Sequence, residues 1–205
     1  MRDWKPGVYP DIPEADYRAA PPTAKSDLDA FAGRKPGANR KFEIRSAFHC
    51  AVLEGRDKFH ERYHVADEDF KLNTIEGKNR LTTLEMESGK FVIRKSEMAQ
   101  IVGMCKALKT NPKTAKILNL DGNRELMVVA ALDGRTLLSK CRIDLEVHAP
   151  RGTILGELKS TGYHTPDQFE PAMIDFGYAS QAAYYSDCWH AYHNGDYPRF
   201  AFIMV

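Results

Sequence analysis

The spacing of apolar residues changes along the chain, and this change constrains the fold more than any other feature of the sequence. Three short β-rich runs occupy residues 125–131, 136–143 and 153–158. Asp133-Gly134 separates the first two runs, and Pro150-Arg151-Gly152 precedes the third. An Asp-Gly pair suits the two-residue turn whose twist matches that of its flanking strands. The first two runs are therefore predicted to form a hairpin, with the third as a further strand.

Helical periodicity surrounds these strands. Apolar residues recur at three- and four-residue steps over residues 42–53 and again over residues 96–108, where Asn111-Pro112 ends the pattern before a short helix to about Leu118. After Pro166 the chain is predicted to be helical to about Tyr192, and residues 199–205 form a last apolar strand. This order predicts an α/β domain with a central mixed sheet, the hairpin plus further strands, flanked by helices.

Two segments are predicted to be less regular. The first 40 residues are interrupted by prolines and leave room for one short helix over residues 27–31, with Ser26 as its N-cap. The interrupting residues are Pro6, Pro10, Pro13, Pro21, Pro22 and Pro36. Residues 55–90 are charged and poorly periodic, which predicts a long solvated excursion with little regular structure. No repeat or linker divides the sequence, so residues 1–205 are expected to form a single domain.

Composition excludes several classes of protein. The 29 Lys and Arg residues nearly balance 28 Asp and Glu, and a net charge of +1 excludes a basic coat that would bind nucleic acid over the whole surface. The 4 cysteines are too far apart in sequence for zinc-finger or iron–sulfur spacing, which favours a reduced, cytoplasmic protein. No apolar run approaches the roughly 20 residues that cross a bilayer, so no membrane association is expected.

One constellation of residues could support chemistry. Asp144 directly follows the second β-rich run, and Glu157-Leu158-Lys159 lies at the end of the third. Residues two apart on a strand share a face, so Glu157 and Lys159 are predicted to share a pocket while Leu158 points into the core. The carboxylates could hold Mg²⁺ or Mn²⁺. The triplet of acid, any residue and lysine occurs four times in the chain, and a surface ion pair on an edge strand is the alternative interpretation.

Residues on two predicted helices could join this pocket. Gln181 and Tyr185 lie four residues apart on one helical face, with Tyr178 one turn earlier. His49 and Glu54 lie on or just after the first long helix, and an imidazole can bind a divalent metal among carboxylates. Core packing of the aromatic residues and a structural role for the histidine are the alternatives.

Taken in order, these motifs resemble the PD-(D/E)XK nuclease superfamily, and more closely its RecE-like exonucleases of the exodeoxyribonuclease VIII type, which are related to the nuclease domain of RecB. The segment from Phe48 to Glu54 resembles the first-helix motif, and Arg142-Ile143-Asp144 resembles the second motif. Glu157-Leu158-Lys159 resembles the third, and residues 181–185 match Gln-x-x-x-Tyr with Tyr185 in register. Pro6-Gly7-Val8-Tyr9 and Lys25-Ser26-Asp27-Leu28 resemble the approach to the first motif.

The resemblance implies a restriction-endonuclease-like core and assigns roles to these residues. Mg²⁺ would be bound by His49, Asp144, Glu157 and the Leu158 carbonyl, and Mn²⁺ would substitute for it. Glu54 would contact these ligands without binding the metal itself. Lys159 would orient or deprotonate water and offset charge on the phosphoryl oxygens. Gln181 and Tyr185 would position Lys159 or the scissile strand. Candidate phosphate contacts are Arg142, Lys140, Arg45, Arg34, Lys35, Arg40 and Lys41.

The resemblance implies 5′ to 3′ exonuclease digestion of linear duplex DNA in phage or prophage recombination. A single-strand annealing protein would be the partner, and a homo-oligomeric ring would be one means of retaining DNA. Many RecE-like domains continue beyond the strand that ends at Val205, so segments implied in ring assembly are expected to be missing. The alternatives are an endonuclease, another PD-(D/E)XK repair nuclease, or a DNA-binding or assembly module of the same fold that does not cleave.

Overall fold

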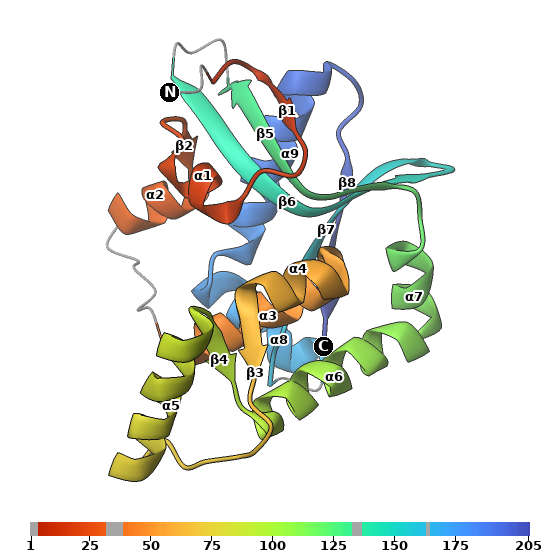
Figure 1. The fold of residues 1–205 in the computed structure, drawn as a ribbon. Helices are drawn as coiled ribbons and strands as arrows, with labels where there is room; N and C mark the ends of the chain where they lie inside the picture. Colours follow the sequence, from red (N-terminus) through yellow and green to blue (C-terminus); the bar gives the residue numbers. More distant parts are fainter. Residues whose placement is uncertain (1–3, 32–38, 133–136, 163–164) are drawn as a thin grey trace. The chain divides into compact units, whose positions relative to one another are not determined.

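A computed structural model describes residues 4–31, 39–132, 137–162 and 165–205 (Figure 1). The chain forms two compact units. Residues 1–37 and 116–204 form the first, which we call the sheet unit, and residues 38–115 with Val205 form the second, the helical unit. One domain can contain two compact units, so the single domain predicted from the sequence stays a prediction.

The sheet unit is built on one mixed sheet (Figure 1). Its strands are β1 (Gly7–Tyr9), β2 (Thr23–Ala24), β5 (Gly122–Ala131), β6 (Leu138–Ala149), β7 (Gly152–Lys159) and β8 (Arg199–Met204). Their order is β1-β5-β6-β7-β8, and β2 pairs with the start of β6. The pairs of β6 with β5 and with β7 are antiparallel, whereas β7 and β8 are parallel. The predicted hairpin is confirmed, and its Asp133-Gly134 turn lies outside the described residues.

Both faces of this sheet are covered. A parallel pair of strands needs a crossover, and α8 (Pro166–Asp175) and α9 (Tyr178–His193) form the crossover between β7 and β8. Buried side chains of β5, β6 and β7 pack with Cys188 and Trp189 of α9. Met127 and Val129 of β5 pack with residues of the amino-terminal segment. The predicted α/β class, with a central mixed sheet flanked by helices, is confirmed.

The prediction of an irregular amino-terminal segment over residues 1–40 is wrong within the described residues 4–31, although the short helix predicted over residues 27–31 is confirmed. This segment contains β1, β2, α1 (Glu14–Ala19) and α2 (Lys25–Phe31). Ser26 lies inside α2 rather than capping it, and the Asp27 carboxylate accepts the Ala24 N–H at 2.8 Å. β1 is ordered by antiparallel pairing with β5, more than a hundred positions away in the sequence. Local periodicity carries no signal of such a distant partner.

The helical unit contains more regular structure than the sequence predicts. Its elements are α3 (Arg40–Leu53), α4 (Gly55–Arg62), β3 (Tyr63–Val65), α5 (Ile75–Ser88), β4 (Phe91–Ile93) and α6 (Lys95–Thr110). The chain then enters α7 (Pro112–Leu118). The helices predicted over residues 42–53 and 96–108 and after Asn111 are confirmed. Residues 55–90 are mostly exposed to solvent, as predicted, but the prediction that they have little regular structure is wrong.

Local capping and a small core explain the order in this segment. The Thr74 hydroxyl accepts the Gly77 N–H at 3.1 Å at the start of α5, and Gly89 ends that helix with a positive φ of 66°. Leu84 packs with Val92 of β4 in a core that also includes Ala66, Phe70 and Leu81. These caps and this small core together order a segment that has few apolar residues.

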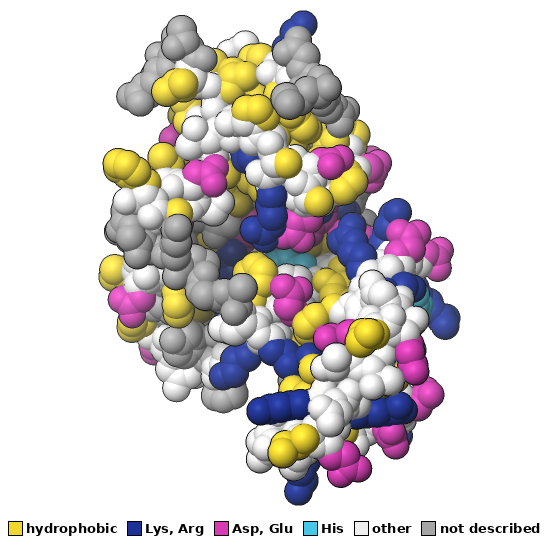
Figure 2. All heavy atoms as spheres, turned by 60° about the vertical axis from the view of Figure 1, so that its left-hand side comes forward, with side chains coloured by type: hydrophobic (Ala, Val, Ile, Leu, Met, Phe, Trp, Pro, Cys, Tyr) yellow, Lys and Arg dark blue, Asp and Glu magenta, His cyan; other side chains and the backbone are white. Residues whose placement is uncertain are grey.

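The surface carries both signs of charge. On the face drawn in Figure 2, Lys and Arg side chains are interspersed with Asp and Glu, in agreement with the net charge of +1. All four cysteines are free thiols. Across the described parts of the chain, no helix is both long and apolar enough to cross a membrane.

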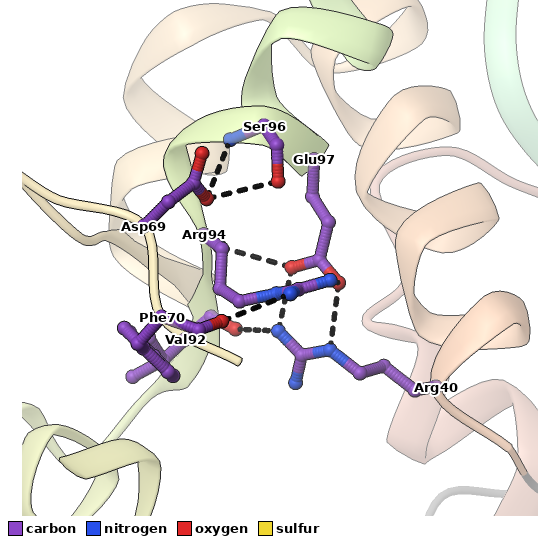
Figure 3. Close-up of polar contacts among 7 residues, drawn as sticks. All are labelled: Arg40, Asp69, Phe70, Val92, Arg94, Ser96 and Glu97. Carbon is purple, nitrogen blue, oxygen red and sulfur yellow. Dashed lines mark hydrogen bonds and ion pairs between the residues drawn. The ribbon is translucent and has the colours of Figure 1, made fainter. Parts of the chain in front are cut away.

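One buried carboxylate joins several parts of the helical unit. Figure 3 shows the guanidinium groups of Arg40 and Arg94 turned toward Glu97 at the start of α6. Arg40 donates to both Glu97 oxygens, at 2.8 and 2.6 Å, and Arg94 donates from its backbone at 2.9 Å and its side chain at 2.8 Å. The same arginines donate to the carbonyls of Val92 and Phe70. Glu97 therefore links α3, β4, α6 and the segment before α5.

Glu97→Gln is expected to destabilise the protein in a pH-dependent way. Burial alone would raise the pKa of Glu97, but hydrogen bonds from Arg40 and Arg94 outweigh it and lower the pKa to about 2. A lowered folded-state pKa stabilises the fold fully above about pH 5, and this contribution, on the order of 3 kcal/mol, is lost as pH falls toward 2. Thermal unfolding from pH 2 to 7 measures it.

The matched control is Glu61→Gln, which removes the exposed Lys58–Glu61 pair of the same unit and should change stability by less than about 1 kcal/mol. If Glu97→Gln and the native protein unfold alike at every pH, the network does not stabilise the helical unit.

Candidate active site

An acid and a lysine meet on β7. The Lys159 ammonium donates to Glu157 Oε2 at 2.9 Å, and the side chain of Leu158 between them is fully buried. This geometry follows from strand alternation, which places residues 157 and 159 on one face and residue 158 on the other.

Gln181 of α9 holds both members of this pair. Its amide oxygen accepts from Lys159 Nζ at 3.0 Å, and its amide nitrogen donates to Glu157 Oε2 at 3.0 Å. A primary amide carries both a donor and an acceptor, so glutamine can bridge an ammonium and a carboxylate. α9 starts after Gly177, which has a φ of 62°, and Gln181 lies in its first turns.

Asp144 lies beside this group on the neighbouring strand. It is buried, and its Oδ2 accepts the backbone N–H of Leu158 at 2.7 Å. The sequence predicts Asp144 at the end of a strand, but β6 continues to Ala149, so that prediction is wrong. The continuation from Leu145 to Ala149 pairs with residues 152–156 of β7, and this pairing extends the strand.

The sheet is locally irregular at Asp144. The β5–β6 ladder pairs Arg124 with Leu145 and Leu126 with Ile143 but omits the position between them. Ile143 packs in the same cluster as Trp189, and Glu146 accepts the Trp189 indole N–H at 3.0 Å. Strict alternation would place residues 143 and 146 on opposite faces. The regular alternation of β6 is therefore interrupted around Asp144.

Glu125 faces this irregularity, and sequence reasoning missed it. It has a φ of 50° inside β5, a strained conformation for a residue with a side chain. A carboxylate oxygen of Glu125 lies within 4.8 Å of one of Asp144, and Arg142 Nε lies 2.7 Å from Glu125 Oε2. The only sequence signal was an acid at the start of an apolar run, which many surface strands share.

The acids determine the charge state of Lys159. Burial alone would lower the pKa of its ammonium, but Glu157 and Asp144 outweigh burial, and the pKa is raised above the ordinary lysine value. The ammonium also lies 4.9 Å from the centre of the Tyr178 ring, a favourable cation–π contact. Lys159 is thus held as a cation by an acid, an amide and an aromatic face.

Tyr185 and Tyr184 point to different neighbours. Tyr185 packs against the core cluster between the sheet and α9, and burial, followed by the charge of Glu157, raises its pKa well above the ordinary value. A hydrogen bond with Gln181 acts in the opposite direction. Tyr184 instead donates its hydroxyl to the Thr23 carbonyl at 2.6 Å. Of the two phenols, Tyr185 is the one beside Gln181 and Glu157.

Two of the predicted phosphate contacts are engaged inside the sheet unit. Lys140 is only 3% exposed and donates to the carbonyls of Tyr17 and Ala20, at 2.8 and 2.5 Å. Its predicted role as a DNA contact is therefore corrected to a structural one, because the ammonium is bound by backbone carbonyls at the end of α1. Arg142 is paired with Glu125.

The remaining predicted residues belong to the helical unit. His49 lies on α3, with its ring edge-on to Phe48 at 5.8 Å. Glu54 follows α3 and accepts two hydrogen bonds from Arg62, at 2.6 and 2.5 Å. Arg45 and Lys41 are exposed on α3, whereas Arg40 is bound to Glu97. Arg34 and Lys35 lie outside the described residues.

The acids of the sheet unit fit a divalent cation. Carboxylate and carbonyl oxygens are the ligands that Mg²⁺ and Mn²⁺ prefer, and Glu125 and Asp144 place oxygens within 4.8 Å of each other. Two carboxylates this close repel each other, and a cation between them relieves that repulsion. Glu157, beside the Leu158 backbone that contacts Asp144, offers a further carboxylate.

The PD-(D/E)XK class of fold carries an acid on a central strand, and an acid and a lysine two residues apart on the next strand. Asp144, Glu157 and Lys159 have this arrangement, and Gln181 from the following helix joins them. Comparison with known families agrees. Residues 22–205 match the family described as a PDDEXK-like domain of unknown function (DUF3799), and the chain belongs to this family. The match includes residues of both compact units. No curated protein matched the chain.

Lys140→Met is expected to lower stability without weakening DNA binding. The substitution leaves the Tyr17 and Ala20 carbonyls without their donor, which should reduce the free energy of unfolding by about 1–3 kcal/mol. Denaturant unfolding measures this loss, and Lys116→Met, at an exposed position of α7, is the control for removal of one positive charge. Weaker, less salt-dependent DNA binding at unchanged stability would contradict the structural role.

Proposed function

We propose that this protein is a Mg²⁺-dependent DNA nuclease, with Mn²⁺ as a substitute, and that it acts as a RecE-like 5′ to 3′ exonuclease on linear duplex DNA. The observation that carries the proposal is the bonded group of Glu157, Lys159 and Gln181 beside Asp144. Family membership supports nuclease chemistry. The exonuclease mode and polarity rest on the sequence resemblance.

The proposed metal ligands are Asp144, Glu157 and the Leu158 carbonyl, with His49 implied by the resemblance. A bound divalent ion would polarise a phosphoryl oxygen and lower the pKa of a water molecule. In hydrolysis the water oxygen bonds to phosphorus, the bond to the leaving sugar oxygen breaks, and that oxygen takes up a proton.

The chain's own side chains would prepare this reaction. Lys159 would orient or deprotonate the water and offset the negative charge that builds on the phosphoryl oxygens. Gln181 would hold Lys159 against Glu157 and so keep the ammonium at a fixed distance from the acids. Tyr185 would support Gln181 from the core.

The proposed biological setting is recombination or repair in a phage or prophage system, with a single-strand annealing protein as partner. Because the net charge is only +1 and the face in Figure 2 mixes both signs, retention of DNA would depend on a local basic surface or a ring-shaped assembly. Arg45 and Lys41, both exposed on α3, are the candidates for such local contacts.

Lys159→Ala and Asp144→Asn are each expected to reduce digestion of end-labelled linear duplex in Mg²⁺ by about a hundredfold or more. The first removes a positive charge at the reacting phosphate, and the second removes a proposed carboxylate ligand of the metal. Lys116→Ala is the control for loss of an exposed lysine. Equal rates for the native protein and both site variants would rule out the site.

The same assay separates the alternative functions. Nicking of a closed circular duplex would indicate an endonuclease, whereas resistance of the circle indicates that the enzyme needs an end. A non-cleaving module would bind the linear duplex without shortening it in either metal.

Glu125→Gln is expected to weaken Mn²⁺ binding by about tenfold, because it removes one carboxylate from the pair within 4.8 Å. Metal binding in the absence of DNA is measured by titration calorimetry or by the electron paramagnetic resonance spectrum of unbound Mn²⁺. Glu170→Gln, an exposed acid on α8, is the control, and His49→Ala tests the ligand implied by the resemblance. Unchanged affinity in Glu125→Gln would limit Glu125 to its pairing with Arg142.

A further inference from the structure

An aromatic side chain projects from the corner between α8 and α9. Phe176 is 60% exposed, so much of its ring is open to solvent. Its position is set by a tight turn, in which the Gly177 N–H donates to the Ile174 carbonyl at 3.1 Å and Gly177 has a φ of 62°. The Gly177 carbonyl then accepts the Gln181 N–H at 2.9 Å. The turn that presents Phe176 is thus the turn that starts the helix of Gln181.

A single side chain, that of Tyr178, connects Phe176 to Lys159. The Phe176 ring centre lies 5.7 Å from that of Tyr178, and the Tyr178 ring contacts the Lys159 ammonium. Phe169 stacks on Tyr178 at 5.6 Å and an angle of 22°, and Phe202 of β8 lies 5.7 Å from it. Tyr178 is therefore supported on several sides, and Phe176 forms the exposed end of this aromatic group.

The charges of α8, the helix that ends one residue before Phe176, indicate which part of a nucleic acid could lie on this ring. The exposed ionisable side chains of α8 are acidic, namely Asp167, Glu170 and Asp175. Carboxylates repel phosphates, so the sugar-phosphate backbone is disfavoured there. An uncharged nucleobase is not repelled, and every base has a flat π face that stacks on an aromatic ring.

We propose that Phe176 is a stacking platform for an unpaired nucleobase next to the phosphate held at Lys159. The placement of the strand rests on the proposed nuclease function. A base inside a duplex has both faces covered by its neighbours, and in a paired end only the outer face of the last pair is open, so a ring beside the reacting phosphate can accept a base that has left the stack. We expect the site to favour a frayed end or a single-stranded nucleotide, with Phe176 stabilising the unpaired form from which cleavage proceeds.

The probe is a duplex with an unpaired 2-aminopurine at one end, placed on each strand in turn, because the emission of this base is quenched when it stacks. Binding is followed in Ca²⁺ and cleavage in Mg²⁺. Phe176→Tyr keeps an aromatic ring, Phe176→Leu keeps apolar area without a π face, and Phe176→Ala removes both. Leu137→Ala, at a position that is 75% exposed before β6, is the control for loss of exposed apolar surface.

We expect quenching with the native protein, Phe176→Tyr and Leu137→Ala, and its loss with Phe176→Leu and Phe176→Ala. Cleavage of a fully paired end should fall about tenfold in Phe176→Ala, from the loss of one base–aromatic stack, and Phe176→Tyr should restore it. Equal quenching in all variants would overturn the proposal. So would a change in molecular mass in solution for Phe176→Ala, since Phe176 would then lie between copies of the chain.

Quenching and cleavage report separately on the stacking site and on the nuclease. Cleavage in Mg²⁺ with quenching that does not depend on Phe176 leaves the nuclease and removes the stacking site. Quenching that depends on Phe176, with no cleavage in either metal, removes the nuclease and leaves a binding site for unpaired bases.

Discussion

The candidate active site depends on one backbone contact between neighbouring strands. The Leu158 N–H donates to Asp144 Oδ2, so the carboxylate of one strand is fixed to the backbone that carries Glu157 and Lys159. A hydrogen bond to an ionised acceptor is stronger than one between neutral groups, and its burial makes the loss of either partner costly. Because this bond joins adjacent strands, the acids keep their spacing without any contribution from a loop.

The crossover helix supplies the other half of the site. β7 and β8 are parallel, so the chain must leave the sheet and return, and α9 packs over the same face as Glu157. Gln181 then reaches both the acid and the lysine. The same connection presents Tyr178 to Lys159 and Phe176 to solvent. Topology therefore explains why residues more than 20 positions apart in sequence form one group.

The failures of sequence reasoning share a physical cause. β1 and β2 are too short to show periodicity and are ordered by pairing with β5 and β6. Residues 55–90 form helices with few apolar side chains, because a small core and well-placed caps at Thr74 and Gly89 are enough. Lys140 looked like a phosphate contact because a lysine on a strand usually points to solvent, whereas here the amino-terminal segment covers it.

The sequence by itself determined the mixed α/β architecture, the hairpin, and the contact of Glu157 with Lys159, because alternation along a strand and periodicity along a helix are local properties. It also placed Gln181 and Tyr185 on one helical face. Only the tertiary structure decided that Asp144 lies inside a strand, that Glu125 adopts a left-handed conformation beside it, and that Lys140 is buried. These features depend on which distant segments pair and pack, and no local pattern records that choice.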